Sequence, residues 1–129
     1  MSPYKPDGYP AVSPYLLVPS AQAVIDFARA VFGAVELRRH DTPDGSVMHA
    51  EIRIGDSIVM MGEAGGQWPA IPTFLHVYVD DVDAVYRRAL DAGGVSVQAP
   101  VQKGDQDKRG GVQDPGGNTW WIATQVSRP

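Results

Sequence analysis

The feature that most constrains this chain is an internal repeat. Subtracting residue numbers gives the same spacing of 61 for five pairs of identical residues: Val18 and Val79, Val24 and Val85, Ala28 and Ala89, Gly33 and Gly94, Gly55 and Gly116. A repeat of this length corresponds to one supersecondary unit that is copied. The 129 residues therefore hold two modules, at about residues 11–62 and 73–126, with a Gly- and Pro-rich linker at residues 63–72.

Each module is predicted to run strand, helix, strand, strand, strand. Ser20 is a good N-cap for the first helix, and Gly33 suits the left-handed backbone at its end. Asp81 and Gly93 bracket the second helix in the same way. The predicted strands cover residues 12–18, 34–40, 47–54 and 57–61, then 73–79, 95–101, 111–113 and 118–125.

The predicted fold class is α+β, in one domain of residues 1–129. Each helix covers one face of its own sheet and leaves the other, concave face open. Two such curved half-barrel sheets would enclose a cleft. Because an open four-stranded sheet invites pairing at its edge, we expect a homodimer. The sequence leaves open whether the modules pair within the chain or across that dimer.

Composition excludes several functional classes. Lysine and arginine total 11 against 15 aspartate and glutamate residues, a net charge of −4, so no basic footprint for nucleic acid is present. The chain has no cysteine, which excludes thiolate metal sites and redox pairs. No apolar run is long enough to cross a membrane, and residues 1–10 carry three prolines and no apolar core of a signal peptide. We therefore expect a soluble, cytoplasmic protein.

Three stretches carry a resemblance to a known family. They are His49-Ala-Glu-Ile-Arg-Ile-Gly-Asp-Ser57, Leu75-His-Val-Tyr-Val-Asp-Asp-Val-Asp83 and Asp114-Pro-Gly-Gly-Asn118. Together with the doubled module they resemble the vicinal oxygen chelate superfamily, which includes glyoxalase I, extradiol dioxygenases, fosfomycin-resistance transferases and bleomycin-resistance proteins. The resemblance covers roughly residues 12–125 and looks strongest to the small stand-alone glyoxalase-like branch, whose members often carry a demethylubiquinone-methyltransferase label.

The resemblance also implies where a metal would bind. Metal-dependent members take ligands from the first and last strand of each module, and these positions fall on Ser13, Met60, Phe74 and Trp121. A divalent cation needs imidazole or carboxylate donors at about 2.0–2.3 Å. A serine, a thioether and two aromatic rings do not supply them. We therefore expect no metal and no cofactor.

The same positions offer an aromatic, polarizable surface instead. Strand alternation and the family geometry predict a ligand-binding cleft lined by Ser13, Tyr15, His49, Glu51, Met60, Phe74, His76, Tyr78 and Trp121. Such a wall suits a small hydrophobic or aromatic molecule. The predicted function is metal-free binding of such a molecule by a homodimer, in the manner of bleomycin-resistance-like members, with no nucleic-acid or membrane partner.

Two histidines keep an enzymatic alternative open. His76 could be satisfied by a neighbouring group, contact a ligand or act in catalysis. His49 and Glu51 could form a base with its orienting carboxylate, half of a metal site, or a polar stripe that makes cross-strand ion pairs with Arg53 nearby. Side chains two apart on one strand lie about 7 Å apart, which predicts no direct hydrogen bond. The alternative is a lyase, isomerase or dioxygenase that uses a metal at His49, Glu51 and His76, or acid–base catalysis at His76.

Alternation and composition also predict where several other residues lie. Trp120 and Trp121 point to opposite faces, and we place Trp120 in the core and Trp121 in the cleft. Met48 is expected on the same face as Ala50. Trp68 in the linker is either a lid or an anchor for the loop. Residues 102–110 form a charged loop that either clamps an anionic ligand or is simply solvated.

Overall fold

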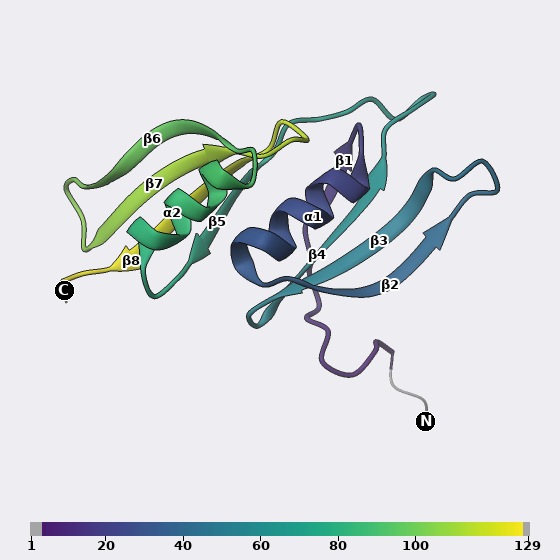
Figure 1. Ribbon diagram of the computed structural model, residues 1–129. Coiled ribbons are helices and arrows are strands. Elements are labelled where there is room, and N and C mark those ends of the chain that lie inside the picture. The colour runs from purple at the N-terminus through teal and green to yellow at the C-terminus, as the bar shows by residue number, and fades with distance from the viewer. Residues whose placement is uncertain (1–3, 128–129) are drawn as a thin grey trace.

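The computed structural model describes residues 4–127 as two β-α-β-β-β modules, which confirms the predicted α+β repeat. The first module contains β1 (Tyr15–Val18), α1 (Ala21–Phe32), β2 (Val35–Asp41), β3 (Val47–Ile54) and β4 (Ser57–Glu63). The second contains β5 (Phe74–Tyr78), α2 (Val82–Asp91), β6 (Val95–Gln102), β7 (Asp107–Gln113) and β8 (Thr119–Gln125). Figure 1 shows α1 and α2 side by side in front of their sheets.

Each module forms a mixed four-stranded sheet. The strand orders are β1-β4-β3-β2 and β5-β8-β7-β6, and the first strand of each module is parallel to the last. The same topology therefore leaves β1 and β5 at equivalent edges. Within the described residues no helix is long and apolar enough to cross a membrane.

The helix boundaries follow from the expected caps. The side chain of Ser20 accepts a hydrogen bond from the backbone of Ala23 at 3.2 Å, and Asp81 accepts one from Ala84 at 3.1 Å. Gly33 ends α1 with φ of 66°, and Gly93 follows α2 with φ of 96°. The glycine that ends α2 is therefore Gly93 and not Gly94, the residue that lies 61 positions after Gly33.

Two strand predictions were wrong in extent. The ladder of β1 begins at Tyr15, not at residue 12, because Pro14 has no N–H to donate. β7 begins at Asp107, four residues before the predicted start, so half of the expected charged loop is a strand. Its ladder residues Gly110 and Gly111 lack side chains, and Arg109 and Lys108 are charged, so the stretch carries no apolar alternation that would indicate a strand.

A bulge breaks the alternation of β3. His40 pairs with His49, but the next residue of β2, Asp41, pairs with Val47, so Met48 has no partner. Met48 is consequently exposed, while Val47 is buried with Ala50 in the core. The expectation that Met48 shares the face of Ala50 was wrong for this reason.

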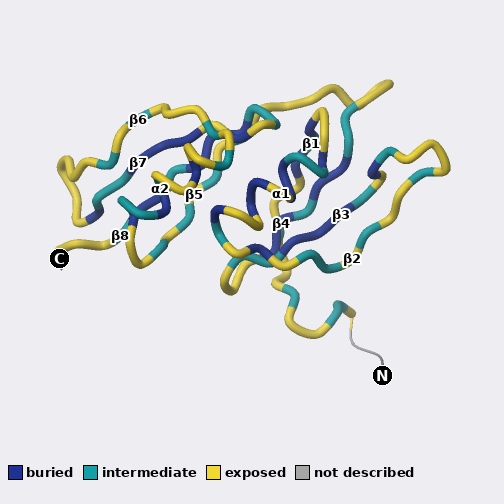
Figure 2. The backbone as a smooth tube through the Cα atoms, viewed as in Figure 1, coloured by how far each residue is buried: buried dark blue, intermediate teal, exposed yellow. Residues whose placement is uncertain are grey.

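Burial is concentrated under the helices. Two apolar clusters, one for each module, share Phe32, Ile54 and Leu75. Figure 2 shows that the central strands β3, β4, β7 and β8 are the buried ones, whereas β2 and β6 are mostly exposed. Arg88 on α2 joins the modules by donating two hydrogen bonds to the carbonyl of Val31 on α1, at 3.0 and 2.6 Å.

Candidate functional site

The structure divides the nine predicted ligand-binding residues into two groups; eight lie on strands, on the helix-free faces of the sheets, and Ser13 lies in the segment before β1. The first-face group is Ser13, Tyr15, His49, Glu51 and Met60. The second-face group is Phe74, His76, Tyr78 and Trp121. Within one chain the two groups belong to different sheets and do not share a cavity. The two helices lie on the same side of the molecule, so the open faces do not close over one another (Figure 1).

In the first-face group, Tyr15, His49 and Glu51 form a continuous hydrogen-bonded series. His49 Nε2 lies 2.7 Å from Glu51 Oε2, and His49 Nδ1 lies 3.2 Å from the hydroxyl of Tyr15. The expectation of no direct bond between His49 and Glu51 was wrong, because their long side chains bend toward each other from backbones about 7 Å apart. Arg53 makes none of the ion pairs found in residues 4–127, so the cross-strand interpretation is not supported.

An unexpected partner completes this series. Tyr9, in the segment before β1, donates its hydroxyl to Glu51 Oε1, and the guanidinium of Arg38 lies 5.5 Å from its ring centroid. Glu51 is thereby only 3% exposed, although it stands on the open face. Burial raises the pKa of Glu51, but the hydrogen bonds from His49 and Tyr9 outweigh burial and hold that pKa below its ordinary value. Residue spacing offers no signal for a contact across 42 positions.

The second-face group is organised around Arg109 on β7. Its Nε donates to His76 Nε2 at 3.1 Å, and its Nη2 contacts Asp107 Oδ2 at 2.9 Å. Tyr78 donates its hydroxyl to the same Asp107 oxygen at 2.7 Å. Arg109 also contacts Asp105 at 3.3 Å, so the charges of this segment are largely paired with one another and not free to clamp an anion.

His76 is held as a neutral acceptor. Burial lowers its pKa, and the nearby positive charge of Arg109 lowers it further. Because Arg109 has no lone pair, Nε2 of His76 must accept this hydrogen bond, which places the ring proton on Nδ1. The sequence left three interpretations of His76 open. The contact with Arg109 corresponds to the first, a histidine whose hydrogen bonding is satisfied by a neighbouring group.

The two adjacent tryptophans lie on opposite faces, as predicted. Trp120 is 1% exposed, packs against Phe32 at 4.9 Å between ring centroids, and donates its indole N–H to Asp114. Trp121 is half-buried on the open face, where its indole covers Gly111 so closely that a Cβ there would meet the ring at 2.7 Å. Trp121 lies beside His76 in the ladder but does not line the cavity between the modules.

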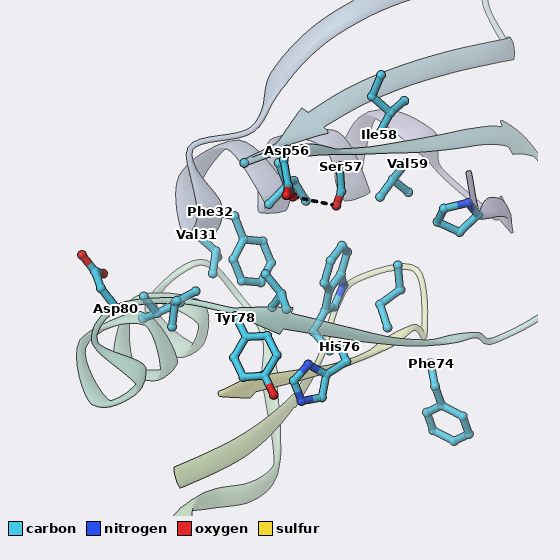
Figure 3. A pocket seen from close by; sticks show the side chains of 18 of the residues that line it. Val31, Phe32, Asp56, Ser57, Ile58, Val59, Phe74, His76, Tyr78 and Asp80 are labelled. Carbon is cyan, nitrogen blue, oxygen red and sulfur yellow. Dashed lines mark hydrogen bonds between the residues drawn. The ribbon is translucent and has the colours of Figure 1, made fainter. Parts of the chain in front are cut away.

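A cavity of about 740 Å³ lies between the modules. Its inner wall is largely apolar and includes Val31, Phe32, Ile58, Val59, Val77 and Trp120. Three predicted residues, Phe74, His76 and Tyr78, stand on β5 along this cavity. Figure 3 shows their side chains on the side of β5 away from Asp56 and Ser57, so they form its rim on the open face. Phe74 is 76% exposed and Tyr78 64% exposed.

A second cavity of about 800 Å³ lies at the other end of the first module. Its walls include Tyr15, Leu17, Met48 and Trp68. Trp68 is 61% exposed and is held by a backbone bridge to Gly65. Trp68 borders this cavity, which is the position that the lid interpretation requires.

The comparison with protein families decides the relationship of this chain. A family model described as Glyoxalase/Bleomycin resistance protein/Dioxygenase superfamily matches residues 11–122. The chain belongs to this superfamily. The uncharacterized protein Rv0887c of Mycobacterium tuberculosis (strain ATCC 25618 / H37Rv) is 38% identical over 128 residues, which cover 91% of this chain and 75% of that protein. Mb0911c of Mycobacterium bovis, also uncharacterized, shares the same identity over 84% of its length.

Solved structures of other proteins share the fold. TioX from Micromonospora sp. ML1 superposes with a TM-score of 0.74 at 24% identity, covering 89% of this chain and 99% of that one. A PhnB protein from Bacillus cereus that carries a 3-demethylubiquinone-9 3-methyltransferase label gives a TM-score of 0.72 at 16% identity, over 89% and 99% of the two chains. At these identities the likeness concerns the fold alone.

The residues of this chain do not fit the divalent cation of metal-dependent glyoxalase-superfamily members. The corresponding positions carry Ser13, Met60, Phe74 and Trp121, whose side chains include no imidazole and no carboxylate. Across residues 4–127 no three His, Asp or Glu side chains gather as a metal site would require. The alternative set of His49, Glu51 and His76 is divided between the two sheets. His49 also contacts the hydroxyl of Tyr15, and His76 accepts a hydrogen bond from Arg109.

Proposed function

We propose that the protein is a metal-free, small-molecule-binding member of the glyoxalase superfamily. It holds a hydrophobic or aromatic ligand in the cleft between its two modules. The observation that carries this proposal is the inter-module cavity with its apolar inner wall of Val31, Phe32, Val77 and Trp120. The metal-free part is supported by the residues at the four positions that the resemblance assigns to metal ligands, Ser13, Met60, Phe74 and Trp121, which carry a hydroxyl, a thioether and two aromatic rings. These side chains contribute polarizable surface instead of metal donors.

The inter-module cavity supports a ligand of this class. Its volume of about 740 Å³ suits a drug-sized molecule, and its inner wall is apolar. At the rim, Phe74 and Tyr78 offer exposed aromatic faces, and neutral His76 offers an N–H at Nδ1. An aromatic ligand would be held by stacking and apolar burial, and oriented by one or two polar contacts. We propose that the working form is a homodimer, in which the first-face group of a second copy could cover the exposed second-face group.

Ligand binding is tested by titrating the protein with 8-anilinonaphthalene-1-sulfonate and a panel of neutral aromatic molecules. Binding is followed by calorimetry and by tryptophan emission, since Trp120 borders the cavity. Phe74→Ala is expected to weaken binding about tenfold, the effect of losing about 1.4 kcal/mol of contact. Trp121→Ala tests the adjoining open face, and we expect it to weaken binding as well.

Tyr4→Ala is the matched control, because Tyr4 is also a largely exposed aromatic residue and lies outside both cavities. Equal affinity of wild type and Phe74→Ala, or no binding by any member of the panel, would contradict the proposal. Elemental analysis of the purified protein tests the metal-free part: zinc, nickel, manganese or iron in a one-to-one ratio would refute it. Sedimentation equilibrium tests the homodimer.

A further inference from the structure

The hydrogen-bonded series on the first sheet ends at the second cavity. Tyr15 lines that cavity, and its hydroxyl is the end of the series that begins at Glu51. The hydroxyl lies over Gly62, where a Cβ would stand only 3.1 Å from it. The absence of a side chain at Gly62 therefore lets the hydroxyl sit beside His49 and face the cavity.

The direction of the hydrogen bonds follows from the chemistry of the groups. Glu51 is an ionised carboxylate and only accepts, so His49 Nε2 must carry a proton. When His49 is neutral, its Nδ1 is then a lone pair that accepts the proton of Tyr15. The oxygen of Tyr15 is left with its lone pairs free for a donor in the cavity. Glu51 thus acts as the carboxylate that orients a base, His49 is that base, and Tyr15 is the hydroxyl that the base faces.

We infer that Tyr15, His49 and Glu51 form a proton-accepting site for a weakly acidic hydroxyl, such as that of a phenol or an enol, bound in the second cavity. The ligand O–H bond breaks as its proton joins the oxygen of Tyr15, and the hydroxyl proton of Tyr15 moves to His49 Nδ1. The ligand becomes an oxyanion and His49 an imidazolium, with no electron gained or lost. Glu51, buried beside the ring, stabilises the imidazolium.

The cavity walls fit this ligand class. Leu17, Met48 and Trp68 supply apolar and aromatic surface for a flat ring. The cavity also contains the carboxylate of Glu63, but both of its oxygens accept backbone hydrogen bonds, from Ala21 at 3.0 Å and Val47 at 3.1 Å. Both oxygens of Glu63 are therefore engaged in the fold. The cavity is also lined by Asp44, whose Oδ1 accepts hydrogen bonds from the hydroxyl of Thr42 and the backbone N–H of Ser46.

Other titratable and charged groups stand around the series. His40 on β2 lies 6.4 Å from His49 between ring centroids. Tyr9, in the segment before β1, donates its hydroxyl to the carboxylate oxygen of Glu51 that His49 does not contact. Together with Arg38, which lies over the ring of Tyr9, it shields the Glu51 end of the series from solvent. The inference goes beyond the ligand proposed for the inter-module cleft and does not depend on it.

The test uses 4-nitrophenol, whose neutral and ionised forms absorb at different wavelengths. Titrating pH with the probe bound to the wild-type protein should give a probe pKa lower by about one unit than in buffer, a tenfold preference for the anion. Tyr15→Phe and His49→Gln should abolish this lowering, and Glu51→Gln should reduce it. Tyr86→Phe is the matched control, since Tyr86 bonds Ser96 on the helix side of the other module.

Trp68→Ala gives a second measurement that does not disturb the core, because Trp68 is exposed. It should weaken probe binding several-fold and leave the pKa of the bound probe lowered. Circular dichroism shows whether each variant is folded. No binding of the probe by the wild type at millimolar concentration would overturn the inference, and so would a lowered probe pKa that persists in folded Tyr15→Phe. Failure of the cleft proposal would appear instead in the aromatic panel and Phe74→Ala.

Discussion

Replacing Asp114 by alanine is expected to remove a large part of the stability of this fold. The carboxylate is 4% exposed in the turn between β7 and β8. Its Oδ1 accepts the backbone N–H of Gly116 at 2.7 Å and that of Asn118 at 3.0 Å. Its Oδ2 accepts the side-chain amide of Asn118 at 3.1 Å and the indole N–H of Trp120 at 2.8 Å. One side chain thus satisfies four donors.

The size of the loss follows from the donors that are left behind. Asn118 is 0% exposed and Trp120 1%, so the backbone and side-chain N–H groups of Asn118 and the indole N–H would all lose their acceptor in a buried place. Each unsatisfied buried donor costs about 1–3 kcal/mol. Because the turn can relax and admit water, we expect a total of about 3–6 kcal/mol. That is a substantial share of the about 5–15 kcal/mol by which small domains are stable.

The effect should extend to the inter-module cavity. Asn118 accepts the backbone N–H of Thr73 at 3.1 Å, directly before β5, and Trp120 lines the cavity. Urea unfolding followed by circular dichroism gives the free energy of unfolding. Asp44→Ala is the control, since Asp44 accepts comparable bonds from Thr42 and Ser46 in an exposed turn and should barely move the midpoint. A midpoint for Asp114→Ala that matches the control, with an unchanged slope, would refute the reasoning.

Two further predictions test the second sheet. In an NMR titration His76 should show a pKa below that of an ordinary histidine, and Arg109→Gln should raise it; an unchanged value would contradict the role given to Arg109. With a lowered pKa, folded His76 binds fewer protons than His76 in the unfolded chain, so the free energy of unfolding should decline as pH falls through about 6.5. Urea midpoints measured against pH should show this contribution in the wild type and lack it in His76→Gln. Gly111→Ala should displace the indole of Trp121, change the tryptophan emission and lower the free energy of unfolding by about 1–3 kcal/mol. Gly104→Ala is the control and should have none of these effects, because a Cβ there would have no atom within 4 Å.

The sequence was informative where structure depends on local rules. Ser20 and Asp81 cap the helices through side chains that need only the following turn, so their roles could be predicted from the residues alone. The opposite orientation of Trp120 and Trp121 follows from the two-residue period of a strand. The repeat of 61 residues predicted the doubled module and, through it, the superfamily.

What could not be predicted depends on contacts distant in sequence. Tyr9 reaches Glu51 across 42 positions and turns an exposed strand residue into a buried one. The bulge at Met48 arises from the pairing of β2 with β3, which alternation within β3 does not reveal. The nine predicted lining residues lie in two groups within one chain, because the two modules pack through their helices. Whether the two groups meet across a homodimer, the pairing that the sequence left open, stays a prediction.

The two modules use one framework for different chemistry. A row of paired residues crosses the first sheet as Tyr15, Met60 and Glu51, and the equivalent row crosses the second as His76, Trp121 and Gly111. In the first row Glu51 supplies a buried carboxylate that can balance an imidazolium. The equivalent position in the second row is Gly111, and the indole of Trp121 occupies the space above it. In the proposed proton transfer Glu51 supports the positive charge that forms on His49, while Gly111 leaves room for a flat aromatic surface beside His76. This difference is the structural basis on which we propose proton transfer at the first sheet and aromatic binding beside the second.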